Sequence, residues 1–165
     1  MIGSCRARLG LVWLLMLAPA QSILAAEIAD TWIGGVYTGK SPRPVALAEP
    51  AAWQQANEIA VRTPGAFVLV GTGGSMQPLY RPGTILVLQR IAYTRLECGQ
   101  TVIYRNQARR AVAHVLVAKV RDGWRITGLN TSWHDMEPVL PDNLIGVVIA
   151  AFQPIGEPGP RFAAH

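Results

Sequence analysis

Hydrophobic residues recur along the chain with two different spacings, and the first is helical. After Glu49-Pro50, small and apolar residues recur at intervals of three and four, at Ala52, Trp53, Ala56, Ile59 and Ala60. Proline is tolerated at the first helical position, so this pattern predicts a helix that begins at Glu49-Pro50. Packing against the rest of the protein is the role we expect for it.

From residue 66 onward the spacing changes from about 3.6 to about 2, and turn residues separate short apolar runs. The predicted strands are 66–70, 84–89, 101–104, 111–120, 124–127 and 144–152. Arg81-Pro82-Gly83 and Arg121-Asp122-Gly123 supply turns, the second of them inside a hairpin. We therefore expect a compact unit of mainly antiparallel sheet between residues 66 and 153.

Composition agrees with this pattern. Half of the 165 residues are hydrophobic and 15% are charged, which is typical of a globular chain. The 16 glycines and 12 prolines favour many turns and short strands and argue against an all-helical fold. Residues 27–65 are expected to form a linker, including the stiff Ser41-Pro42-Arg43-Pro44 stretch, followed by the helix, and residues 154–165 a tail.

The first 26 residues have the pattern of a targeting segment. Arg6 and Arg8 precede an uncharged apolar run, and small residues follow at Ala18-Pro19-Ala20 and Leu24-Ala25-Ala26. This predicts a secretory signal peptide that is cleaved after Ala20 or Ala26, with a retained membrane anchor as the alternative. In both cases the positive-inside rule places the rest of the chain in the periplasm or on the outer face of the cytoplasmic membrane.

Charge and cysteine usage exclude several functions. The formal net charge is +5, but the basic residues are scattered, so we expect no nucleic-acid partner. Cys98 is the only cysteine outside the leader, so the mature chain cannot form an internal disulfide. We expect neither a metal nor another cofactor, because cysteine and histidine do not occur at metal-ligand spacing.

Candidate chemistry begins at Ser75, which lies in a glycine-rich turn between two predicted strands (G-T-G-G-S-M-Q-P, 71–78). A serine hydroxyl is a weak nucleophile unless a neighbouring base takes its proton. His114 interrupts an apolar strand, where a titratable ring must find a partner. Alone, such a histidine is more often structural, and Ser75 an ordinary turn residue. The Ser75 backbone N–H could stabilise an oxyanion, with help from Thr72.

Five segments, in this order, resemble the conserved boxes of type I signal peptidases, a superfamily that includes the LexA-type self-cleaving repressors. They are G-S-M-Q-P (74–78), P-G-T-I-L-V (82–87), G-Q-T-V-I-Y (99–104), A-H-V (113–115) and N-L-I-G-V-V (143–148). The resemblance covers about half of the chain, residues 66–152. It implies a coiled antiparallel β-sheet or partial barrel with one short N-terminal helix.

The same resemblance assigns roles to individual residues. Most bacterial signal peptidases use a Ser-Lys dyad, whereas the endoplasmic-reticulum and archaeal-like branch has histidine as the base, and this chain is similar to that branch. Ser75 and His114 are then the nucleophile and base, and Asp135 the carboxylate that orients the imidazole. Leu129 and His134 stand where the branch has aspartates, and Gly73 where many members have a hydroxyl. The resemblance places Gly73, Gly74, Met76 and Pro78 at the substrate cleft.

Lys119 is the competing base, since it is the only lysine after Lys40. Five residues separate it from His114 along one predicted strand, which places it on the opposite face and beside a turn. We therefore expect His114 to be the base.

These observations predict a serine endopeptidase that cleaves exported or membrane-associated proteins after small residues, in association with the membrane surface. The main alternative is a secreted binding or assembly module that has the same fold without turnover. A LexA-type repressor is disfavoured for two reasons. The leader occupies the place of a DNA-binding domain. Self-cleaving members of that family cut an Ala-Gly or Cys-Gly bond upstream of the serine, whereas the only such dipeptide here, Cys98-Gly99, lies downstream of Ser75.

Overall fold

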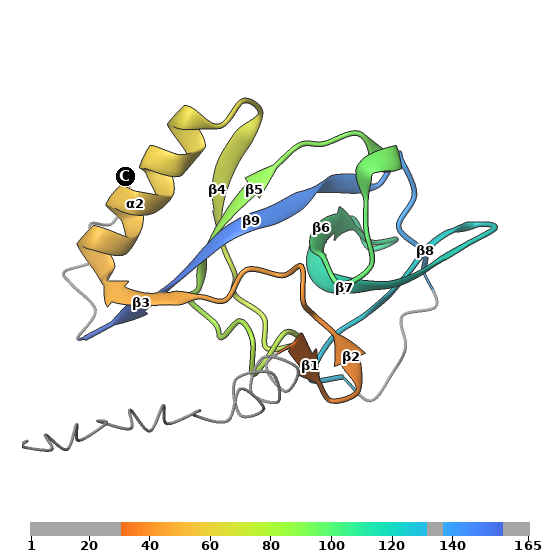
Figure 1. Ribbon diagram of the computed structural model, residues 1–165, viewed down its shortest axis with the longest axis horizontal. Coiled ribbons are helices and arrows are strands. Elements are labelled where there is room, and N and C mark those ends of the chain that lie inside the picture. The colour runs from red at the N-terminus through yellow and green to blue at the C-terminus, as the bar shows by residue number, and fades with distance from the viewer. Residues whose placement is uncertain (1–30, 132–136, 157–165) are drawn as a thin grey trace, which may run out of the picture.

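A seven-stranded sheet with a helix on one face forms the body of the protein (Figure 1). The computed structural model describes residues 31–131 and 137–156. The elements are β1 (Trp32–Ile33), β2 (Val36–Tyr37), β3 (Val45–Ala48), α2 (Glu49–Arg62), β4 (Ala66–Val70), β5 (Ile85–Gln89), the 3₁₀ turn η1 (Tyr93–Arg95), β6 (Thr101–Arg105), β7 (Ala111–Val120), β8 (Gly123–Thr127) and β9 (Leu144–Ile155). The fold is mainly β and mostly antiparallel, as the sequence predicts.

The strand order is β4-β5-β9-β6-β7-β8, and β3 pairs in parallel with the end of β9. The strands at the two ends of this order, β4 and β8, do not pair with each other, so the curved sheet does not close into a barrel. Strand β9 runs through the middle of the sheet, with β6 and β5 beside its first part and β3 beside its last part (Figure 1). Register shifts interrupt its pairing with both β5 and β6, and such bulges bend a strand.

Strand β5 is buried on both faces, and its alternation connects the helix with the candidate site. Ile85 and Val87 pack under α2, whereas Leu86 and Leu88 belong to the core cluster beneath Ser75. Ala52 and Ala56 are completely buried and four residues apart, so the helix approaches the sheet closely through small side chains. The predicted helix therefore has the packing role that its sequence indicates.

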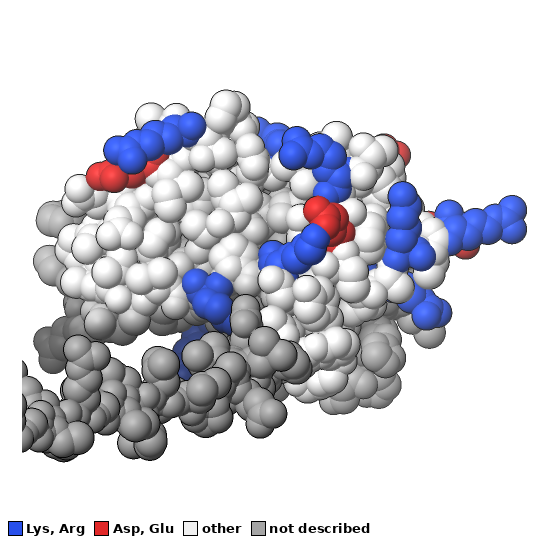
Figure 2. All heavy atoms as spheres, in the orientation of Figure 1, with Lys and Arg blue, Asp and Glu red and all other residues white. Residues whose placement is uncertain are grey.

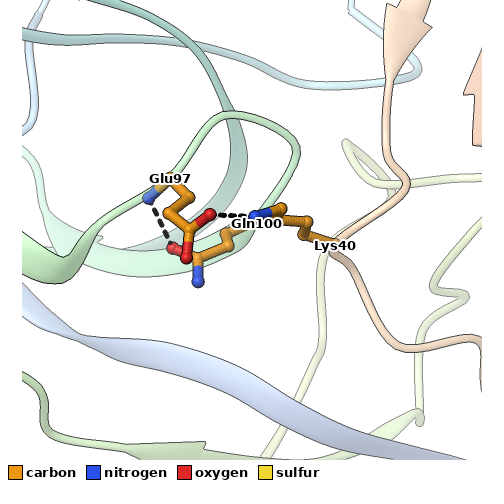
Figure 3. A network of polar contacts seen from close by, with 3 residues as sticks. All are labelled: Lys40, Glu97 and Gln100. Carbon is orange, nitrogen blue, oxygen red and sulfur yellow. Dashed lines mark hydrogen bonds and ion pairs between the residues drawn. The ribbon is translucent and has the colours of Figure 1, made fainter.

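The segment predicted as a linker is part of the folded body. It contains β1, β2 and β3, and Val45 of β3 pairs with Phe152 of β9. Lys40 forms an ion pair with Glu97, whose backbone N–H donates to Gln100 Oε1 at 2.9 Å (Figure 3). Ser41 Oγ donates to the Gly99 carbonyl at 2.8 Å and lies 2.7 Å from Thr101 Oγ1. Residues 40 and 41 are thus attached to the loop that precedes β6.

The predicted strands match the structure closely. Strands 66–70 and 111–120 have the expected bounds, and the others differ by at most one residue at each end except β9. β9 continues to Ile155 instead of ending at residue 152, because its last residues pair with β3. The predicted leader lies outside the described residues. Within the described ranges, no helix has the length and apolar character needed to cross a membrane.

Candidate functional site

Ser75 lies in the connection between β4 and β5, and the base of this connection is fixed by backbone hydrogen bonds. Gly71 N–H donates to the Thr84 carbonyl at 2.9 Å, and Gly83 N–H donates to the Gly71 carbonyl at 2.7 Å. Met76 and Tyr80 follow Ser75 and are both 3% exposed within the core cluster. Ser75 itself is partly exposed, and the buried side chains that follow it anchor the turn to the core.

Tyr80 connects this turn to the segment that precedes β3. Its hydroxyl donates to the Pro42 carbonyl at 2.8 Å. Burial raises the pKa of the Tyr80 hydroxyl, so this group remains a neutral hydrogen-bond donor at physiological pH. The residues after the candidate nucleophile thus have a fixed position.

His114 is positioned by the pairing of β6 with β7. It lies opposite Val102 and is only 5% exposed. Its Nδ1 atom lies 3.5 Å from the hydroxyl oxygen of Tyr104, and the two ring centroids are 6.0 Å apart. The imidazole is therefore held among buried groups, with one nitrogen facing a tyrosine hydroxyl.

Ser75 and His114 come together at Gly128, directly after β8. A Cβ atom at Gly128 would lie 3.0 Å from the Ser75 carbonyl oxygen and 3.1 Å from His114 Nε2. These two atoms are thus within roughly 6 Å of each other although 39 residues separate their positions in the chain. A side chain at this position would push against both groups and against Thr131 Oγ1, which would lie 2.8 Å from the Cβ atom.

The loop that follows Gly128 fixes the backbone of Ser75. The N–H groups of Leu129 and Asn130 both donate to the Ser75 carbonyl, at 2.8 and 2.9 Å. Among the described residues, the Ser75 N–H donates to none, so it is available to an incoming group. The Ser75 hydroxyl likewise has no hydrogen bond to His114, and such bonds are often long before a substrate binds.

A groove of about 390 Å³ opens beside Ser75. Its floor is apolar, and its lining residues come from the β4 end, the Ser75 turn, β5, β6 and the start of β7. Leu69, Met76, Leu86 and Ile103 are among the lining residues.

Two strand edges border the groove without a strand partner within the described ranges. Leu116 N–H donates to the Gln100 carbonyl, so the backbone groups of Leu116 point toward the segment that continues into β6. The backbone groups of successive residues in a strand point to opposite sides, so those of Ala111 and Ala113 point away from β6. β8 pairs only with residues 115–120 of β7, so these groups remain unpaired. On the other side, β4 pairs only with β5, and the backbone groups of Val70 point away from it. An extended peptide could hydrogen-bond to both edges.

The structure separates the residues predicted at the cleft into two sets. Thr72, Gly73 and Met76 line the groove together with Ser75. Gly74 and Pro78 do not, which differs from the prediction. The Gly74 carbonyl is turned toward the Gln77 N–H and the Asn130 amide, and Pro78 is exposed outside the groove.

The remaining predicted residues have clear positions or fall outside the described part. Asp135 and His134 lie outside the described residues. Lys119 is exposed near the turn between β7 and β8, opposite Trp124, as expected of a residue that is not the base. Leu129, which stands where the resemblance has an aspartate, packs against the core cluster below Ser75.

Comparisons with known proteins give no family for this chain. No protein-family model matches it, and no curated protein matches it significantly. The functional interpretation therefore depends on the resemblance of its motifs and on the geometry described above.

Tyr104 is the site residue that the sequence did not single out. Its position in an apolar strand is typical of a core residue. The register of β6 and β7 contains the missing signal, because Tyr104 lies opposite Val112, two residues from His114 on the same face. Diagonal neighbours of this kind can bring aromatic side chains into contact across two strands.

Proposed function

We propose that the chain is a serine endopeptidase that binds its substrate as an extended peptide in the groove beside Ser75. The observation that carries this proposal is the approach of the Ser75 carbonyl and His114 Nε2 to one point at Gly128. The N–H groups of Leu129 and Asn130 hold the serine turn at this point, and the pairing of β6 with β7 holds the imidazole beside it. The partly exposed serine and the buried imidazole are the residue types that acyl transfer needs.

In the proposed reaction, Ser75 Oγ attacks the scissile carbonyl carbon while His114 Nε2 takes the hydroxyl proton. The C–N bond then breaks, and His114 returns this proton to the leaving amine, which leaves an ester on Ser75. Water attacks the ester carbonyl with His114 again as the base, and Ser75 regains its proton as the new carboxyl end departs. The unpaired Ser75 N–H supports the reaction as a donor to the developing oxyanion.

The base requires a tautomer with an unprotonated Nε2 and a proton on Nδ1. Tyr104 Oη, 3.5 Å from Nδ1, is placed to accept a hydrogen bond from that N–H. Asp135 remains the carboxylate that we propose to stabilise the imidazolium, on the resemblance alone. We further propose that substrates are exported or membrane-associated proteins with small residues before the cut, processed on the outer side of the membrane.

Covalent labelling tests the nucleophile without knowledge of the substrate. The full chain, purified in mild detergent, is treated with a fluorophosphonate probe, and labelled peptides are identified by mass spectrometry. We expect one adduct, on Ser75, and strongly reduced labelling in His114→Ala, because the probe reacts only with an activated serine. Labelling of Ser75 at the rate of other exposed serines would instead favour the binding or assembly module.

Tyr104→Phe is expected to lower kcat for peptide cleavage by roughly three- to tenfold, because removal of one neutral hydrogen bond costs about 0.5–1.5 kcal/mol. The KM is expected to change little, since Tyr104 is buried and does not line the groove. The acidic limb of the kcat–pH profile should also move, whereas a structural role alone would leave it in place. Steady-state kinetics between pH 5 and 9 measures both effects.

A further inference from the structure

Two arginines stand on the rim of the groove beside Ser75, one from each wall. Arg81 follows Tyr80 in the connection to β5, and Arg110 directly precedes β7. Both residues line the groove and both are exposed. The otherwise apolar groove therefore has a cationic rim.

Both arginines are fixed through their backbones, while their guanidinium groups make no bond to a described residue. The Arg81 carbonyl accepts hydrogen bonds from the N–H and hydroxyl of Thr84, at 3.0 and 2.6 Å. The Arg110 N–H donates to Asn106 Oδ1 at 2.9 Å, and its carbonyl accepts from the Asn106 N–H at 3.0 Å. Each arginine side chain therefore begins at a fixed backbone position beside the groove.

No described carboxylate neutralises these two charges. The ion pairs within the described ranges join Lys40 to Glu97 and Arg62 to Glu58, and the groove lining contains neither aspartate nor glutamate. Figure 2 shows further basic side chains on one face of the molecule, several of them at the right, where the β7–β8 hairpin lies. The groove therefore offers an anionic group one cationic residue on each of its two walls.

The position of Arg110 gives the distance between this charge and the reaction. Four residues separate Arg110 from His114 along the chain, which corresponds to about 13 Å of extended strand. A peptide that lies along the Ala111–Ala113 edge would have its third or fourth residue from the cut bond beside Arg110. Guanidinium groups bind carboxylates with strong, directed hydrogen bonds.

We propose that the groove selects peptides that carry an aspartate or glutamate three or four residues from the cleaved bond, held by Arg81 and Arg110. This inference rests on the proposed peptidase function and adds a specificity to it. An anionic lipid headgroup is the competing ligand for the same two charges, but the arginines line the groove itself, beside Ser75, which favours the peptide.

The test compares matched peptide substrates that differ only in aspartate or asparagine at each of these positions, on both sides of the cut. For the full chain in neutral detergent, we expect kcat/KM to be about three- to tenfold higher for one aspartate peptide, with less difference at 0.5 M salt. Arg81→Gln with Arg110→Gln should bring this ratio close to one. Arg121→Gln, an exposed arginine outside the groove, removes a charge in the same way and should leave the ratio unchanged.

Charge reversal adds a test that does not depend on a loss. Arg110→Glu should reverse the preference, so that a lysine peptide becomes better than the aspartate peptide. Cleavage without any aspartate preference would overturn the inference and leave the peptidase intact, whereas absence of both cleavage and Ser75 labelling would overturn the proposed function. An unchanged ratio in the double variant, together with its loss of binding to phosphatidylglycerol vesicles, would assign the arginines to the membrane and also overturn the inference.

Discussion

Ser75→Ala and His114→Ala are each expected to lower kcat/KM for peptide cleavage by at least about 10⁴-fold, measured with fluorogenic peptides that have small residues before the cut. The serine supplies the atom that forms the acyl bond, and without the imidazole its hydroxyl is a weak nucleophile. Because the two residues act as a unit, the double variant should be no slower than either single variant.

The control for this prediction is Lys119→Met, which removes the competing base. Lys119 is exposed and lies outside the groove, so this variant should retain activity and stability. Circular dichroism and thermal unfolding establish that all variants remain folded. Cleavage by Ser75→Ala would refute the proposed mechanism, and loss of activity in Lys119→Met with activity in His114→Ala would transfer the role of base to the lysine.

Most of the sheet could be predicted because the local pattern determines it. The continuous apolar run between Pro82-Gly83 and Gln89 is sufficient to define β5, and the Arg121-Asp122-Gly123 turn defines the β7–β8 hairpin. β3 was missed for a physical reason. Its four residues are mostly exposed, and their pairing partner is the end of β9, about 100 residues later. No local periodicity carries information about such a distant parallel pairing.

The candidate site, like the sheet, could be predicted only where the local sequence determines it. Sequence reasoning found Ser75 because glycines surround it, and His114 because a titratable ring interrupts an apolar strand. Their proximity came only from the resemblance, since it depends on how β7 and β8 bring Gly128 to the Ser75 turn. Tyr104 was missed because its role depends on the register of two strands. Arg81 and Arg110 were ordinary turn residues until both were found at one groove.

Gly128→Ala is expected to lower kcat/KM by roughly three- to tenfold while the protein remains folded. The added methyl group would lie 2.8 Å from Thr131 Oγ1, 3.0 Å from the Ser75 carbonyl oxygen and 3.1 Å from His114 Nε2, all tighter than ordinary van der Waals contact. Thr131 must therefore shift, and the Ser75 carbonyl and the imidazole must each give by a few tenths of an ångström. Because a displacement of about 1 Å in a catalytic pair costs on the order of 10²-fold in rate, this smaller shift should cost roughly three- to tenfold. Kinetics with the best fluorogenic peptide, at a concentration of folded protein fixed by unfolding curves, measures this loss.

Gly146→Ala is the matched control, because there too a Cβ atom would meet a backbone carbonyl, that of Gln89, at 3.0 Å. Gly146 lies in β9, outside the groove lining, so overpacking there should lower the free energy of unfolding by about 1–3 kcal/mol without specific damage to the site. Equal losses of kcat/KM in the two variants would mean that Gly128 matters only for packing. A loss confined to Gly128→Ala would mean that the space at this glycine sets the distance between nucleophile and base, which is the geometric requirement of the proposed reaction.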